Sequence, residues 1–203
     1  MLTIRPARDS DCTHILALIR ELAEFEQLAH TVQATEPQLR EHLFGPHPRA
    51  EALIAEWAGQ LAGFALYFHN FSTFLAQPGL YVEDIYVRPE FRRRGIGLSL
   101  FQYLAAIAVQ RDCGRMEWSV LNWNTPAIEF YRSLGATPMD EWTVQRLTGE
   151  VLQHLAKGTS GQTEASLKSL LAGAASETLT PDDSQCGSGQ VQRIVRRNPL
   201  APE

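Results

Sequence analysis

The spacing of hydrophobic residues predicts an N-terminal part with one short strand and two helices. The strand covers Leu2–Arg5. A helix capped by Asp9 or Asp11 runs to about Ala29. Its apolar face is formed by four residues three or four positions apart: Ile15, Leu18, Ile19 and Leu22. A second helix starts at Thr35-Glu36-Pro37 and ends near Gly45-Pro46, with proline in the first turn, where its missing N–H costs nothing.

Apolar runs then predict strands. Ala50–Trp57 and Leu61–Phe68 flank Ala58-Gly59-Gln60, which is typical of a hairpin. Phe71–Gly79 is predicted to be a loop that ends at Pro78-Gly79, and Leu80–Val87 is the next strand. The later predicted elements are the helix Leu98–Gln110, the strand Arg115–Val120, the helix from Thr125-Pro126 to Leu134 with Gly135 as its left-handed cap, the strand Trp142–Leu147 and the helix Gly149–Ala156.

The composition changes after Lys157. Gly, Ser, Thr, Gln and Pro dominate through Gln190, and such a segment buries too little apolar surface to fold by itself. We therefore expect a mixed α/β domain over residues 1–156 and a flexible C-terminal extension over residues 157–203.

Charge and cysteine content exclude several classes of protein. The chain of 203 residues has a net charge of −5 at pH 7, which argues against general nucleic-acid binding. No apolar run reaches the roughly 20 residues that span a bilayer. The three cysteines, Cys12, Cys113 and Cys186, have no paired or metal-type spacing, so we expect a cytoplasmic protein without a metal.

The most informative stretch is Arg92-Arg93-Arg94-Gly95-Ile96-Gly97, between the predicted strand and helix. Free amides at a helix start, close backbone approach at glycine and arginine charges together suit a pyrophosphate. A dinucleotide-binding fingerprint would need glycine at Leu100, and a Walker loop would need Gly-Lys-Ser/Thr. A glycine-bearing turn selected only for its shape is the alternative.

The same loop resembles the coenzyme A motif Q/R-x-x-G-x-G/A of the GNAT N-acetyltransferases. Further stretches match in order: Ile4-Arg5-Pro6-Ala7, Asp11-Cys12, Gly63-Phe64-Ala65, Leu80–Asp84, Asn122-Trp123-Asn124 and Phe130-Tyr131. Over Met1–Ala156 the chain is similar to the branch that holds the diamine (spermidine/spermine) and thialysine N-acetyltransferases. The resemblance implies a central sheet of about six to seven strands, flanked by helices and splayed between the fourth and fifth strands. It also implies acetyl-CoA as co-substrate and a homodimer.

The resemblance implies Tyr131 as the general acid for the leaving thiolate, because a phenol is protonated at neutral pH. The alternative is a core aromatic ring. Glu83 is the implied general base or acceptor anchor, acting directly or through water. Side chains alternate along a strand, so Glu83 and Asp84 are expected on opposite sheet faces. The alternative for both Glu83 and Asp84 is an ion pair on an edge strand.

The implied coenzyme-binding residues are Ile85, Tyr86, Val87, Arg92, Arg93, Arg94, Gly95, Ile96, Gly97, Leu98 and Asn124. The implied acceptor-binding residues are Phe25, Glu26, Glu83, Asp84, Asp140 and Glu141. The expected activity is acetyl transfer to a primary amine in a ternary complex. A diamine or polyamine is the favoured acceptor, and thialysine or another lysine-like amino acid is the alternative. A protein-lysine acetyltransferase and a non-catalytic acetyl-CoA-binding module are further alternatives.

Overall fold

The computed structural model describes residues 1–157 of the chain. By its contacts the chain divides into two compact units, Met1–Thr137 and Pro138–Glu203. The first unit holds the sheet and most of the helices, and α5 (Gly149–Lys157) belongs to the second. The domain boundary at Ala156 stays a prediction. Apart from Lys157, the predicted flexible extension lies outside the described residues.

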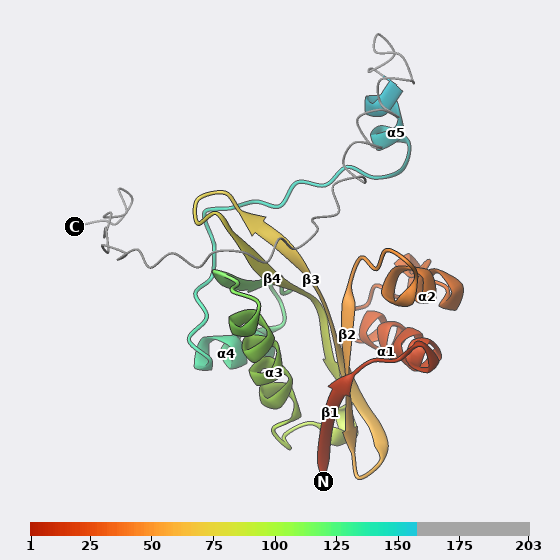
Figure 1. The fold of residues 1–203 in the computed structure, drawn as a ribbon, viewed down its shortest axis with the longest axis vertical. Helices are drawn as coiled ribbons and strands as arrows, with labels where there is room; N and C mark the ends of the chain where they lie inside the picture. The colour runs from red at the N-terminus through yellow and green to blue at the C-terminus, as the bar shows by residue number, and fades with distance from the viewer. Residues whose placement is uncertain (158–203) are drawn as a thin grey trace, which may run out of the picture. The chain divides into compact units, whose positions relative to one another are not determined.

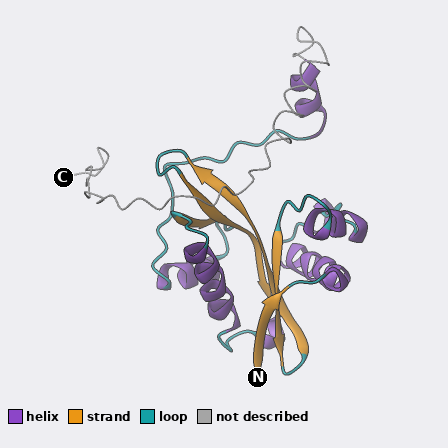
Figure 2. Cartoon of the chain, viewed as in Figure 1, coloured by secondary structure: helices purple, strands orange, loops and turns teal. Residues whose placement is uncertain are grey.

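The first unit is built on one mixed sheet, whose strands are orange in Figure 2. Its five strands have the order β1-β2-β3-β4-β5. Its strands are β1 (Leu2–Pro6), β2 (Glu51–Trp57), β3 (Gln60–Ser72), β4 (Gln77–Val87) and β5 (Arg115–Trp118). The first four strands pair antiparallel, and β5 is parallel to β4. Within residues 1–157 the expectation of six to seven strands was too high.

The strand predicted at Trp142–Leu147 is wrong. The segment has no regular secondary structure, and Trp142 and Val144 are 71% and 78% exposed. Alternating apolar residues form a strand only when a neighbouring strand takes their backbone hydrogen bonds and one face is buried. The described part of the chain supplies neither condition here.

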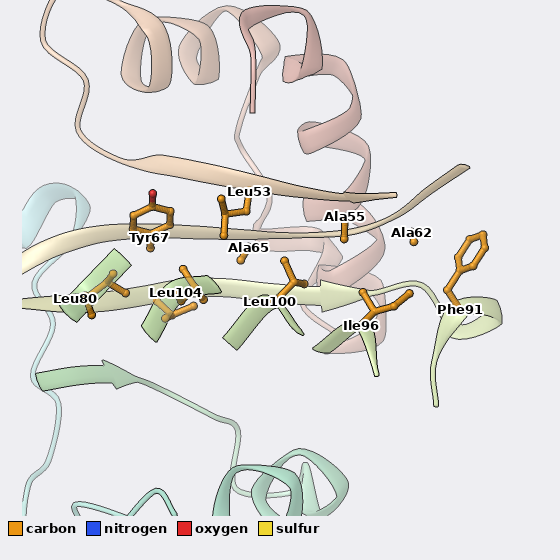
Figure 3. Close-up of a cluster of buried hydrophobic side chains, with 12 residues drawn as sticks. Leu53, Ala55, Ala62, Ala65, Tyr67, Leu80, Phe91, Ile96, Leu100 and Leu104 are labelled. Atoms are coloured by element: carbon orange, nitrogen blue, oxygen red, sulfur yellow. The ribbon is translucent and has the colours of Figure 1, made fainter. Parts of the chain in front are cut away.

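Four helices flank the sheet: α1 (Cys12–Phe25), α2 (Glu36–Phe44), α3 (Ile96–Gln110) and α4 (Thr125–Ser133). Figure 1 shows α1 and α2 on one face of the sheet and α3 and α4 on the other. Leu100 and Leu104 of α3 are fully buried beside Leu53 and Leu80 of the sheet (Figure 3). Burying each leucine contributes about 2 kcal/mol.

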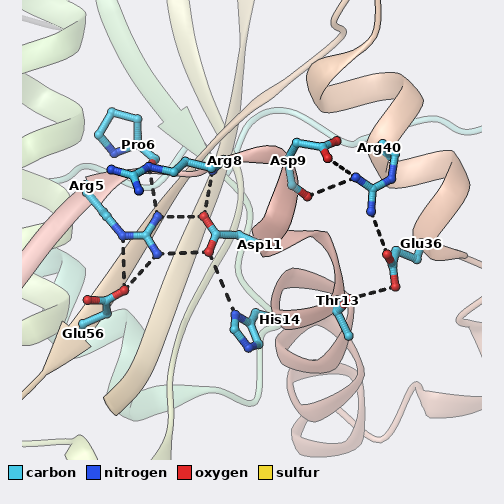
Figure 4. Close-up of polar contacts among 10 residues, drawn as sticks. All are labelled: Arg5, Pro6, Arg8, Asp9, Asp11, Thr13, His14, Glu36, Arg40 and Glu56. Carbon is cyan, nitrogen blue, oxygen red and sulfur yellow. Dashed lines mark hydrogen bonds and ion pairs between the residues drawn. The ribbon is translucent and has the colours of Figure 1, made fainter. Parts of the chain in front are cut away.

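The start of α1 is fixed by ion pairs rather than by a side-chain cap. Arg5 of β1 binds Asp11 at 2.7 Å and Glu56 of β2 at 2.8 Å (Figure 4). Hydrogen bonding to the Arg5 guanidinium lowers the pKa of the buried Asp11 carboxyl. Arg40 of α2 pairs with Glu36 of the same helix and with Asp9 in the turn before α1, and the Thr13 hydroxyl of α1 donates to Glu36 at 2.8 Å, so α1 and α2 are tied to each other.

The β3–β4 hairpin is longer than expected. Phe71 and Pro78 are ladder partners, so the predicted loop Phe71–Gly79 is reduced to Thr73–Ala76. Proline is tolerated near the beginning of a strand, and the pairing therefore extends past the Pro78-Gly79 turn signal. Phe74, at the turn itself, is 94% exposed.

A β-bulge interrupts β4 at Glu83. On β3, Leu66 pairs with Asp84 and the next residue, Tyr67, pairs with Val82, so Glu83 has no partner. The extra residue shifts the side-chain alternation by one position. Leu80 and Val82 therefore belong to the cluster packed on α3, whereas Tyr86 belongs to the cluster packed on α1 and α2.

Candidate active site

A cavity of about 650 Å³ lies beyond the point where β4 and β5 stop pairing. The ladder between the two strands covers Gly79–Val82 and Arg115–Trp118 and then ends. From Glu83 onward, β4 therefore has no strand partner on this side. The cavity is lined by this part of β4, the end of α1, the loop before α3 and the first turns of α3 and α4.

Most of the site residues expected from the sequence line this one cavity. They are Phe25, Glu26, Glu83, Asp84, Ile85, Tyr86, Val87, Arg92, Arg93, Gly95, Ile96, Gly97, Leu98, Asn124 and Tyr131. Residues far apart in the chain thus meet at the edge of the sheet. Asn124 also accepts a hydrogen bond from the amide of Ala127, so it begins α4 as well as facing the cavity.

Three expected residues behave differently. The Arg94 side chain does not line the cavity; its guanidinium lies 5.3 Å from the centre of the Trp57 ring and 5.9 Å from that of Phe91. A direct contact of this guanidinium with the coenzyme is therefore not supported. Asp140 and Glu141 are exposed and belong to the second unit, so their part in acceptor binding stays a prediction.

An aromatic floor was missed by the sequence reasoning. Phe101 lies edge-on to Trp118, Phe130 and Tyr131, with ring centres 4.9, 5.8 and 5.5 Å away. The other missed lining residues are Leu22, Val82, Phe91, Ser119, Val120, Pro126 and Ala127. One signal was present in the sequence: Phe101 is four positions after Gly97, so it lies on the same helix face as the loop.

The loop before α3 is built to bind an anion. Arg93 and Gly95 have left-handed φ angles of 60° and 76°. None of the backbone amides from Arg93 to Leu98 donates to another protein group within residues 1–157. Backbone that alternates in this way turns successive N–H groups toward one point, and the start of the helix adds its dipole. A pyrophosphate fits this set of donors.

Gly97→Val tests this cradle. A Cβ on Gly97 would meet only Phe130, at 3.9 Å, so the variant should fold. The two added methyl groups should then crowd the bound phosphates and raise the Kd for CoA by about 10-fold or more, equivalent to about 1.4 kcal/mol. Calorimetric titration with CoA measures this, and Gly97→Ala is the graded control. Unchanged binding by a folded valine variant would rule out the cradle.

Three carboxylates face the cavity without a basic partner. Glu26, Glu83 and Asp84 form no ion pair with any residue in the described range. Burial raises the pKa of Asp84 to about 6, with smaller contributions from the charges of Glu83 and Glu26. Burial also raises the pKa of Glu26. Glu83 and Asp84, expected on opposite sheet faces, both line this cavity at the edge of the sheet, and Glu83 is the unpaired residue of the bulge.

Tyr131 lines the same cavity as these carboxylates and is close enough to Glu26 to be affected by its charge. Its ring packs 5.2 Å from Trp118 and 5.5 Å from Phe101, which fixes its orientation. Burial, followed by the charge of Glu26, raises the pKa of its phenol, so the group is protonated at neutral pH. The hydroxyl has no hydrogen-bond partner among the described residues and is therefore free to bind a ligand.

Sequence and structure comparisons agree on one family. The sequence model described as "Acetyltransferase (GNAT) family" matches residues 15–136, which include the loop, the bulge and Tyr131. The chain belongs to the GNAT acetyltransferases. It is an acetyl-CoA-dependent N-acetyltransferase.

Two relatives of this GNAT enzyme act on amino acids. The mouse (Mus musculus) thialysine N-epsilon-acetyltransferase is 38% identical over 164 residues, 75% of this chain and 96% of the relative. The L-ornithine N5-acetyltransferase of Arabidopsis thaliana is 33% identical, covering 76% and 87%. Among solved structures, an integron cassette protein from the mobile metagenome of V. cholerae has a TM-score of 0.65 and 29% identity, covering 77% and 98%.

Two features relevant to the site are absent from the described residues. No helix within residues 1–157 is long and apolar enough to cross a bilayer. In the same range, no group of three or more His, Cys, Asp or Glu side chains has an arrangement that could hold a metal ion.

Proposed function

We propose that this enzyme acetylates a primary amine of a small cationic acceptor by direct attack in a ternary complex. The observation that carries the proposal is the set of three unpaired carboxylates, Glu26, Glu83 and Asp84, beside the free hydroxyl of Tyr131. A partly buried carboxylate such as Asp84 is costly to ionise without a counter-charge. An ammonium group supplies that counter-charge.

The carboxylate pair at the bulge has two tasks in this reaction. An alkylammonium group has a pKa near 10.4, so it must lose a proton before its nitrogen can attack. A carboxylate whose pKa is about 6, as for Asp84, is a better proton acceptor than an ordinary one. We infer that the exposed Glu83 receives the amine, and that the pair takes the proton directly or through water.

Tyr131 and the unpaired part of β4 act on the other side of the reacting carbon. Acetyl-CoA supplies a thioester, which is already activated, so positioning carries much of the rate. Ile85, Tyr86 and Val87 line the cavity where β4 has no partner strand on the β5 side. Their backbone amides on that side can hydrogen-bond the acetyl carbonyl as charge develops on its oxygen. The Tyr131 hydroxyl then donates its proton to the departing sulfur.

Two acceptor classes follow from this arrangement. A diamine or polyamine would place one nitrogen at Glu83 and Asp84 and a second at Glu26. A lysine-like amino acid such as thialysine or ornithine would do the same with its side-chain and α-amino groups. The activities for which these two relatives are named support an amino acid as the acceptor. The excess of carboxylates in the cavity supports any acceptor with two cationic groups.

The test is a CoA-release screen of diamines, polyamines, thialysine, ornithine, lysine and lysine peptides, with wild type and Glu26→Gln. We expect turnover of free amines with two cationic groups. Loss of the Glu26 charge should raise their KM by about 10-fold, the effect of one partly buried ion pair, and leave a monoamine such as butylamine unchanged. Turnover of peptides alone would favour a protein-lysine acetyltransferase, and no CoA release with any amine would refute the proposal.

A further inference from the structure

Three side chains from separate segments form a stack beside the carboxylates. The Arg92 guanidinium lies 4.8 Å from the centre of the Phe25 ring, and the Trp123 ring lies 5.8 Å from the same ring at a tilt of 54°. Phe25 ends α1, Arg92 begins the anion-binding loop and Trp123 belongs to the turn before α4. The stack therefore links the three segments that meet around the cavity.

Each member of the stack is held in place by its backbone. The left-handed Gln27 (φ 62°) and the bond from the Leu28 amide to the Ala23 carbonyl, 2.7 Å, end α1 directly after Phe25 and Glu26. The Arg92 Nε–H donates to the Val87 carbonyl at 2.9 Å.

The Trp123 turn is fixed in the same way. The Asn124 amide donates to the Leu121 carbonyl at 2.9 Å, and the Thr125 amide donates to the Trp123 carbonyl at 2.8 Å. Side chains on such anchored backbone present a wall of defined shape rather than a mobile surface.

The position of the stack relates it to the acceptor. Phe25 and Arg92 line the cavity, and both chain neighbours of the stack, Glu26 after Phe25 and Asn124 after Trp123, line it as well. The Phe25 ring is 39% exposed at the edge of the cavity, and Trp123, which is 52% exposed and does not itself line the cavity, packs against that ring. An amine bound between Glu26 and the Glu83–Asp84 pair would have its chain beside the Phe25 ring.

We propose that the Trp123–Phe25–Arg92 stack sets the width of the acceptor, an inference that rests on the proposed amine acetylation. A straight alkyl chain can lie against the ring faces, whereas a ring or branch on the chain would push Phe25 off Arg92 or off Trp123. Arg92 contacts the Phe25 ring through a cation–π interaction, and Trp123 contacts the same ring through an aromatic interaction. Trp123 is thus a specificity-determining residue.

The test compares two diamines with the same number of carbons along the path between their nitrogens. One is hexane-1,6-diamine, and the other is 1,4-bis(aminomethyl)cyclohexane, whose path carries a ring. Wild type should prefer the straight diamine in kcat/KM. Trp123→Ala should shift the ratio toward the ring compound by about 10-fold or more, the usual effect of relieving one crowded contact. Tyr103→Ala, which removes an exposed aromatic side chain of α3 outside the cavity, is the matched control.

Calorimetric titration of both diamines into the CoA complex gives a readout that does not need turnover. The proposed width filter, meaning exclusion of wide acceptors by the Trp123–Phe25–Arg92 stack, is supported if Trp123→Ala changes the ratio of affinities and Tyr103→Ala does not. An unchanged ratio overturns the filter, as does an equal loss for both diamines together with weaker CoA binding, which would assign Trp123 to the coenzyme. A shift in binding without acetylation of any amine would refute the proposed function and leave the filter standing.

Discussion

Tyr131→Phe should lower turnover by about 100- to 10,000-fold, the range for loss of a general acid. The ring packs on Phe101 and Trp118 and remains in the variant, while the hydroxyl has no described hydrogen-bond partner to lose. The melting temperature and the affinity for CoA should therefore stay close to wild type. Pre-steady-state acetyl transfer at saturating substrates measures the chemical step.

Tyr103→Phe is the control for this result, because the same atom is removed from an exposed tyrosine outside the cavity. A chemical step near the wild-type rate in the Tyr131 variant would remove the phenol from the mechanism. The proton would then have to reach the sulfur from water or from another group.

Asp84→Asn should stabilise the folded protein at neutral pH while it impairs acetyl transfer. The pKa of Asp84 is raised from 3.8 to about 6, so the folded state binds this proton more tightly than the unfolded chain. Ionisation of Asp84 therefore lowers the stability as pH rises from 3.8 to about 6, and the full cost persists above that window. At about 1.4 kcal/mol per pKa unit, removing the charge should raise the free energy of unfolding by about 2 to 3 kcal/mol at neutral pH.

The pH dependence of this gain in stability shows whether it comes from removal of the Asp84 charge. Chemical denaturation should show the gain at about pH 7.5 and almost none at about pH 3, which lies below the Asp84 pKa of both states, 3.8 and about 6. Glu83→Gln, at the exposed neighbouring position, should give no comparable gain at either pH. A gain of equal size at both pH values would mean that the introduced amide acts by packing, and a loss at neutral pH would mean that the Asp84 charge is already compensated.

Local chemistry made the anion-binding loop predictable. Glycine spacing and a helix start determine where amides go unpaired, and Arg93 to Leu98 follow that rule. Tyr131 followed from the order of motifs in the family rather than from its own surroundings in sequence. The helices could also be predicted from the sequence, because apolar residues at helical spacing, such as Ile15 and Leu18, are buried whatever the details of packing.

Features that depend on distant partners escaped the sequence reasoning. The bulge at Glu83 arises from the register between β3 and β4, and alternation applied to β4 alone cannot reveal it. The contacts of Phe101 with Trp118 and Tyr131 join three elements, and no local pattern encodes them. The predicted strand at Trp142–Leu147 failed for the same reason, since a strand exists only with its neighbour.

For the fold of β4, the number of residues at the bulge matters more than which residue stands at position 83. A substitution of Glu83 leaves the count unchanged, so Tyr86 keeps facing α1 while Leu80 and Val82 keep facing α3. Loss of one residue would restore plain alternation and turn Ile85, Tyr86 and Val87 to the opposite faces in a single step. The fold therefore tolerates point substitution at position 83, whereas an insertion or deletion there would rearrange the wall of the cavity.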